Sequence, residues 1–176
     1  MYFEWSMEQI PLRIKYLEET SGCKLDMTRQ SLVSLRRWFL DSAEVENTPL
    51  KRMDELKRLI KKSPFAKEII RENETQFSLK TEYIMRDIGM YAGQYFVETS
   101  DKLHWDYFTG RDDYIANMPV ISGFADTGFD PPFPMQFEPN NMIGVIASNI
   151  FDHTQKETDL FDLCNLWLES YTERGE

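Results

Sequence analysis

The chain has 176 residues, of which 41% are hydrophobic, 14% aromatic and 28% charged, and its formal net charge is −10. This length predicts a single domain over residues 1–176, and the aromatic and aliphatic content is sufficient for a hydrophobic core. Two cysteines are too few for the disulfide framework of a small secreted protein. No apolar run reaches the roughly 20 residues that span a bilayer. The first residues lack the basic and apolar segments of a signal peptide, so we expect a cytoplasmic protein without a membrane partner.

The charge is unevenly distributed along the chain. Residues 1–74 carry 14 Lys and Arg against 13 Asp and Glu, whereas residues 75–176 carry 6 against 17. Residues 51–71 alone hold eight basic and three acidic groups. This pattern is compatible with a nucleic-acid contact, but a solvated basic face, or one that faces the acidic half of the same protein, is the more economical interpretation. A strongly acidic body repels polyphosphate, so we expect no nucleic acid as partner and a favourable encounter with a basic protein. Solubility alone is the competing explanation of the same charge.

Helical spacing of apolar residues predicts several helices in the first hundred residues. We expect a first helix over residues 6–19, capped by Ser6, and a second from about Thr28. Thr48-Pro49 predicts a third start, with threonine as N-cap and proline at the first helical position, and Ser63-Pro64 predicts a fourth.

A central helix is expected over residues 75–98, with apolar side chains over a wide arc. Gly89 and Gly93 lie four residues apart within it, at a cost of about 2 kcal/mol relative to alanine. That cost indicates a close approach of the helix backbone to a sheet or to another helix.

After residue 100 the pattern changes to short β-rich runs that Gly, Pro and Asp separate, which predicts strands between about 103 and 138. A short helix is expected near Asn140, and a capping box of Thr154 and Glu157 predicts the start of a last, amphipathic helix. The sequence therefore predicts an α+β fold. It has a helical part over about 1–100 and an α+β part over about 101–176. The small sheet is mainly antiparallel, and the C-terminal amphipathic helix packs on the core. The predicted buried stripe of that helix is Leu160, Leu163, Cys164, Trp167, Leu168 and Tyr171.

Catalytic patterns are weak in this chain. A nucleophile elbow, a P-loop, CxxC and HExxH are absent, so we expect no metal and no cofactor. His104 and Asp106 share one face of an expected strand and could act as a base with its orienting carboxylate. The alternative function is therefore a small enzyme or ligand-binding domain with a pocket around residues 104–138. Its candidate residues are His104, Trp105, Asp106, Tyr107 and Phe124.

A partner-binding surface is predicted on the irregular acidic stretch 126–138. This stretch combines carboxylates with Phe and Met side chains, and its prolines reduce the entropy lost on binding. The competing interpretation is that its phenylalanines attach a long loop to the core. The predicted contact residues are Asp112, Asp113, Asp126, Phe129, Asp130, Phe133 and Glu138.

Six short segments share one pattern: Leu25-Asp26, Ser31-Leu32, Trp38-Phe39, residues 87–96, Trp105 and residues 119–124. Over roughly residues 25–125 they resemble uncharacterised small bacterial proteins of the domain-of-unknown-function kind. This resemblance implies a helical front end followed by a small α+β body, and some similar families occur among toxin–immunity loci. Together with the acidic charge it leads us to expect a non-catalytic, immunity-type interaction protein that binds a basic protein.

Overall fold

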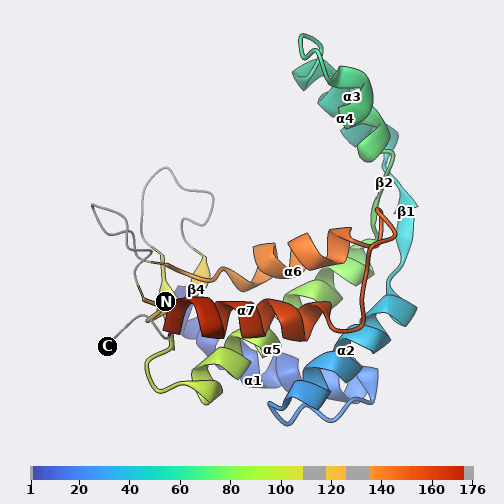
Figure 1. Cartoon of the computed structure of the whole chain (residues 1–176). Helices are drawn as coiled ribbons and strands as arrows, with labels where there is room; N and C mark the ends of the chain where they lie inside the picture. The colour runs from blue at the N-terminus through green and yellow to red at the C-terminus, as the bar shows by residue number, and fades with distance from the viewer. Residues whose placement is uncertain (1, 109–117, 126–134, 173–176) are drawn as a thin grey trace. The chain divides into compact units, whose positions relative to one another are not determined.

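The computed structural model of the chain describes residues 2–108, 118–125 and 135–172 (Figure 1). These residues form mostly helices, with two small antiparallel sheets of two strands each. The predicted α+β fold is thus confirmed. The elements are α1 (Tyr2–Ser21), α2 (Arg29–Ser42), β1 (Val45–Asn47), α3 (Leu50–Leu59), α4 (Ala66–Glu72), β2 (Thr75–Phe77), α5 (Leu79–Thr99), β3 (His104–Tyr107), β4 (Pro119–Ser122), α6 (Pro139–Ser148) and α7 (Asp159–Thr172).

The chain divides into two compact units, the first of residues 1–41 and 84–176 and the second of residues 42–83. In the first unit, α5 lies among other helices, and its Tyr91, Ala92 and Phe96 are fully buried (Figure 1). An edge-to-face aromatic cluster continues this core: Phe96 packs on Phe124 and Phe137, and both of those rings pack on Trp167 of α7. Such ring pairs each contribute about 0.5–1.5 kcal/mol beyond the area they bury.

The glycines of α5 explain how close its neighbours come. A Cβ on Gly93 would overlap the ring of Trp105 on β3, and one on Gly89 would press on the start of α6 at Pro139 and Asn140. The close approach that the sequence predicted is confirmed at both positions. The sheet and a helix therefore pack against consecutive turns of the same helix.

Two arginines tie helices together by ion pairs. Arg13 of α1 donates two hydrogen bonds to the carboxylate of Asp87 on α5, at 2.7 and 2.6 Å. Arg36 of α2 is almost completely buried and donates to Asp159 at 2.8 Å and to the carbonyl of Ile146 at 2.9 Å. Because a buried guanidinium must be paired, Arg36 holds α2, the end of α6 and the start of α7 in one arrangement.

The second unit is a two-stranded ribbon that carries a pair of helices. β1 and β2 pair antiparallel, with Glu46 opposite Gln76, and the chain between them forms α3 and α4. Neither strand was predicted from the sequence. Each has only three residues and β1 is exposed throughout, so neither has an alternating apolar pattern long enough to be recognised. Within α3 and α4 only Met53 is buried.

Five predicted helix starts differ from the structure. Helix α4 begins at Ala66 after Phe65 and not at Ser63-Pro64, and α5 begins at Leu79 because residues 75–77 form β2.

Helix α1 begins at Tyr2, so Ser6 is a buried residue inside it and not its cap. Helix α3 begins at Leu50 with Pro49 as its N-cap, because the hydroxyl of Thr48 donates to the carbonyl of Asn73 across the ribbon. The side chain that the sequence predicted as a local cap thus bonds to a residue far away in the same chain.

The capping box at Thr154 and Glu157 is also wrong. Helix α7 begins at Asp159, and His153 has a positive φ of 54°, which turns the chain before the helix. The carboxylate of Asp159 accepts from the backbone N–H of Lys156 at 2.9 Å while it pairs with Arg36. The first residue of this helix is therefore held both by a local backbone N–H and by the buried arginine. The buried stripe itself is confirmed at Leu160, Cys164 and Trp167. Leu163 and Leu168 are half-buried, and the side chain of Tyr171 lies outside the described part of the chain.

Candidate interaction surfaces

Most of the predicted partner-binding residues lie outside the described residues. These are Asp112, Asp113, Asp126, Phe129, Asp130 and Phe133. Glu138 is described, and it is 5% exposed. Its carboxylate accepts hydrogen bonds from the backbone N–H groups of Asn140 and Asn141 at the start of α6. The structure thus gives Glu138 a capping role within the protein, which accounts for its charge without a partner.

The residues of the predicted pocket fall on two faces of β3. Trp105 and Tyr107 are half-buried, and the indole N–H of Trp105 donates to the side chain of Gln94 on α5. His104 and Asp106 alternate with them and are exposed. Phe124 belongs to the aromatic core, where it contacts Phe96 and Trp167. Among the described residues, these side chains thus lie on both faces of β3 and in the aromatic core, and a pocket around residues 104–138 stays a prediction.

The polar face of this sheet does not have the arrangement of a catalytic relay. His104 lies opposite Ser122 in the register of β3 and β4. The hydroxyl of Ser122, however, donates directly to Asp106 at 3.2 Å and accepts from the amide of Gln136 at 3.1 Å. A nucleophilic serine needs a base to take its proton, and here its hydrogen bond goes to the carboxylate and not to the histidine. This hydrogen-bond network stabilises the sheet and does not activate the Ser122 hydroxyl as a nucleophile.

Cysteine and metal chemistry are similarly restricted. Burial raises the pKa of the Cys164 thiol to about 12, so it stays protonated and unreactive. Within the described ranges, His, Cys, Asp and Glu form no group of three that could hold a metal ion. None of the helices in these ranges is both long and apolar enough to cross a membrane.

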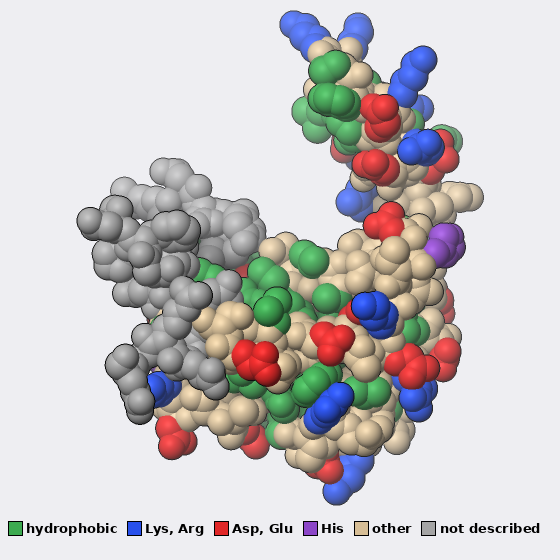
Figure 2. Space-filling model, in the orientation of Figure 1, with side chains coloured by type: hydrophobic (Ala, Val, Ile, Leu, Met, Phe, Trp, Pro, Cys, Tyr) green, Lys and Arg blue, Asp and Glu red, His purple; other side chains and the backbone are tan. Residues whose placement is uncertain are grey.

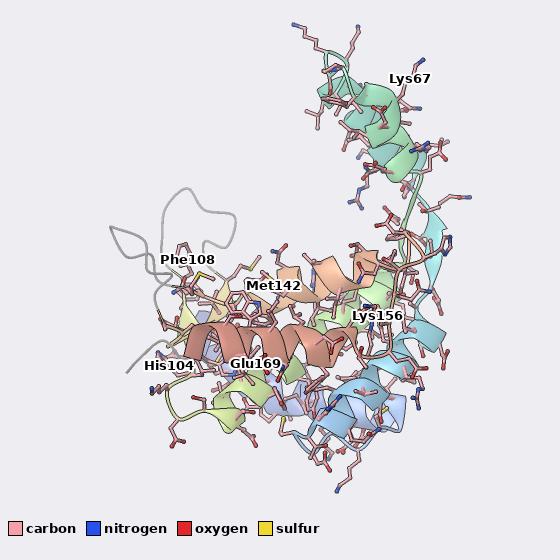
Figure 3. The ribbon with its side chains drawn as sticks, in the orientation of Figure 1. Lys67, His104, Phe108, Met142, Lys156 and Glu169 are labelled. Carbon is pink, nitrogen blue, oxygen red and sulfur yellow. The ribbon has the colours of Figure 1, made fainter. Side chains whose placement is uncertain are left out.

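A surface that combines apolar and acidic side chains lies on α6 and α7. On α7, Asp162, Leu166 and Glu169 form the exposed stripe at i, i+4 and i+7, opposite the buried stripe. Leu166 is 58% exposed, and Val145 of α6 is 55% exposed. Figure 2 shows hydrophobic side chains beside acidic ones on the face of these two helices, and Figure 3 places Met142 and Glu169 on that face. We call Val145, Asp162, Leu166 and Glu169 the α6–α7 surface.

This surface carries negative charge without a cation in its own helices. Helix α6 contains no charged residue, and α7 contains Asp159, Asp162 and Glu169 but neither Lys nor Arg. Asp159 is neutralised by Arg36, whereas Asp162 and Glu169 accept hydrogen bonds from the uncharged side chains of Thr158 and Asn165. This exposed stripe was not predicted from the sequence. The position of Leu166 outside the predicted buried stripe does indicate an exposed apolar side chain.

A second exposed surface lies where α3 and α4 meet, at the end of the helix pair opposite the ribbon (Figure 1). We call residues 57–67 the hairpin tip. Leu59 is 84% exposed and Phe65 is 64% exposed, and Lys67 extends into solvent (Figure 3). The tip contains no acidic residue, and its basic residues, all exposed, are Lys57, Arg58, Lys61, Lys62 and Lys67.

An open pocket of about 240 Å³ lies between α3 and the start of β2. It is below the size of most small-molecule sites, which occupy about 300–1,000 Å³. Its lining is Thr48, Arg52, Glu55, Leu56, Leu59, Asn73, Thr75 and Gln76. The side chain of Arg52 donates to Gln76 and that of Thr48 to Asn73, so much of the polar lining is already paired.

No family model, curated protein or solved structure matches this chain.

Proposed function

We propose that this protein is a non-catalytic interaction protein that binds a basic protein partner through the α6–α7 surface. The observation that carries the proposal is the exposed stripe of α7, in which Leu166 lies one turn from a carboxylate on either side, Asp162 and Glu169. Protein interfaces have apolar centres and polar rims, and this stripe with Val145 has that composition.

The charge of the chain supports a basic partner. Residues 75–176 hold 6 basic and 17 acidic groups, and the summed field of such a body steers a cationic protein towards it. Because the attraction is screened by salt, association with such a partner slows as ionic strength rises. The acidic residues predicted from the sequence, Asp112, Asp113, Asp126 and Asp130, stay predicted contacts for the same partner.

A specific form of the proposal follows from the resemblance to families of toxin–immunity loci. The basic partner is then a toxin, encoded by an adjacent gene, that the protein neutralises in the cytoplasm. Expression of that neighbouring gene alone is expected to arrest growth, and co-expression of this chain is expected to restore it. If co-expression of this chain does not relieve the growth arrest, the proposed immunity role is wrong. The binding experiment below tests the interaction itself.

The binding test uses the full chain as bait in four forms, of which three test the charges. These are the wild type, Asp162→Lys/Glu169→Lys, and a control, Glu8→Lys/Asp101→Lys, which changes two exposed acidic residues on other elements. The two variants have the same net charge, so a difference between them reports the α6–α7 surface and not the overall field. Leu166→Ser is the apolar counterpart. Thermal melts check each fold, since the changed side chains are exposed.

We expect a basic protein that wild type and control retain, that salt elutes, and that both the α7 charge variant and Leu166→Ser lose. Equal retention by all baits would contradict the α6–α7 surface. If the baits retain an acidic or neutral protein with the same dependence on the variants, the α6–α7 surface is a binding site, but the prediction of a basic partner is wrong.

A further inference from the structure

The hairpin tip is apolar and cationic at the same time, and the α6–α7 proposal does not involve it. Leu59 and Phe65 are more exposed than large apolar side chains usually are. Five cations occupy the eleven residues 57–67, and the acidic residues of α3 and α4 (Asp54, Glu55, Glu68 and Glu72) all lie outside the tip. The second unit buries only Met53 of these two helices, so the tip does not contribute a core of its own.

The kind of cation distinguishes between possible partners. Four of the five basic residues are lysines, and lysine is depleted in protein–protein interfaces, where arginine is enriched. Lysine is common on amphipathic segments at membrane surfaces, because its long stem lies along apolar material while the ammonium reaches the headgroups. Nucleic acid would also attract the five cations, but phosphates do not account for Leu59 and Phe65, which leave water only in an apolar environment.

We propose that the hairpin tip binds the surface of an anionic lipid bilayer. Leu59 and Phe65 enter the boundary between headgroups and acyl chains, and Lys57, Arg58, Lys61, Lys62 and Lys67 contact the anionic headgroups. This mode needs no spanning helix. It departs from the expectation of no membrane partner, which depended on the lack of an apolar run long enough to span a bilayer. The partner is the membrane itself, whatever protein the α6–α7 surface binds.

Local charge governs this contact more than net charge. At physiological ionic strength, interactions between exposed charges are largely screened beyond about 8 Å, so charges that approach the headgroups closely contribute most. A basic residue near an anionic surface contributes about 1 kcal/mol. Replacing two lysines by glutamate is therefore expected to weaken binding by more than about thirtyfold.

The experiment is co-sedimentation of the full chain with vesicles of equal parts phosphatidylglycerol and phosphatidylcholine, with pure phosphatidylcholine as the zwitterionic reference. Lys61→Glu/Lys62→Glu tests the charges, against Lys15→Glu/Lys102→Glu as a control of equal net charge on exposed lysines of the first unit. Leu59→Ser/Phe65→Ser tests the apolar contact, against Leu12→Ser/Leu79→Ser, which are similarly exposed elsewhere. Circular dichroism of each variant verifies that its helices are intact.

We expect binding to the anionic vesicles only, a loss of more than about thirtyfold for the tip charge variant, and a clear loss for the tip apolar variant. Both controls should bind like the wild type. Absence of binding, equal binding to pure phosphatidylcholine, or unchanged binding of the tip variants would overturn the proposal. Random-sequence duplex DNA at the same salt is the competing probe. If DNA binds more tightly than vesicles, and Leu59→Ser/Phe65→Ser retains that binding, the tip is a nucleic-acid surface and the lipid proposal fails.

Discussion

The ring of Trp105 on β3 occupies the space that a side chain at position 93 of α5 would need. Its indole N–H donates to Gln94, the residue next to that glycine, at 3.2 Å. The sheet can therefore approach α5 closely only because residue 93 has no Cβ. This contact positions β3, and through its pairing β4, against the core of the first unit.

Gly93→Ala is expected to lower the free energy of unfolding by about 1–3 kcal/mol, because the methyl overlaps a ring that is held by a hydrogen bond. Gly144→Ala in α6 is the matched control, since nothing lies within 4 Å of its added Cβ. It should raise stability by up to about 1 kcal/mol through helix propensity. Urea unfolding of the two variants measures both values. Equal effects of the two changes would show that the Trp105 contact does not restrict position 93.

Arg36→Met should destabilise the protein by about 3–5 kcal/mol, because it leaves the carboxylate of Asp159 and the carbonyl of Ile146 without their buried donor. The adjacent pair of Arg37 and Glu157 is a close control, since it joins the same regions at 2.6 Å but is exposed. Arg37→Met should change stability far less, because an exposed ion pair is screened by solvent. Chemical denaturation compares the two, and a similar cost for both would contradict the role of burial.

Glu138→Ala is expected to cost about 1–2 kcal/mol of stability, because two backbone N–H groups at the start of α6 lose their acceptor. Glu98→Ala, which removes an exposed carboxylate, should change stability far less. Binding of the basic partner should be the same for Glu138→Ala as for the wild type under conditions in which both are folded. Weaker binding with unchanged stability would instead restore Glu138 as a contact residue.

The two cysteines should react very differently with a thiol reagent at mildly alkaline pH. Cys164 is buried with its pKa raised to about 12, whereas Cys23 is half-buried. We expect modification of one thiol in the native protein and of two in denaturant, and none in native Cys23→Ser. Rapid modification of native Cys23→Ser would show that α7 detaches from the core.

The sequence alone determined the elements whose side chains repeat over several turns. The apolar spacing of α7 predicted Leu160, Cys164 and Trp167 as buried, and the two glycines of α5 predicted a close backbone approach. The start of α2 was also predictable, because Thr28 and Ser31 exchange hydrogen bonds within a few residues. These features depend on interactions that are local, or on a period that repeats often enough to be recognised.

Tertiary structure decided what depends on residues far apart in the chain. At the starts of α3 and α7, Thr48 bonds to Asn73 and Asp159 to Arg36, partners that no local pattern reveals. The same holds for the two surfaces that carry the proposals. Leu166 and Leu59 are leucines in amphipathic helices, and only the packing of the folded chain shows that neither is covered by another element among the described residues. Periodicity states which residues share a face of a helix, but the neighbours of that helix decide whether the face is buried.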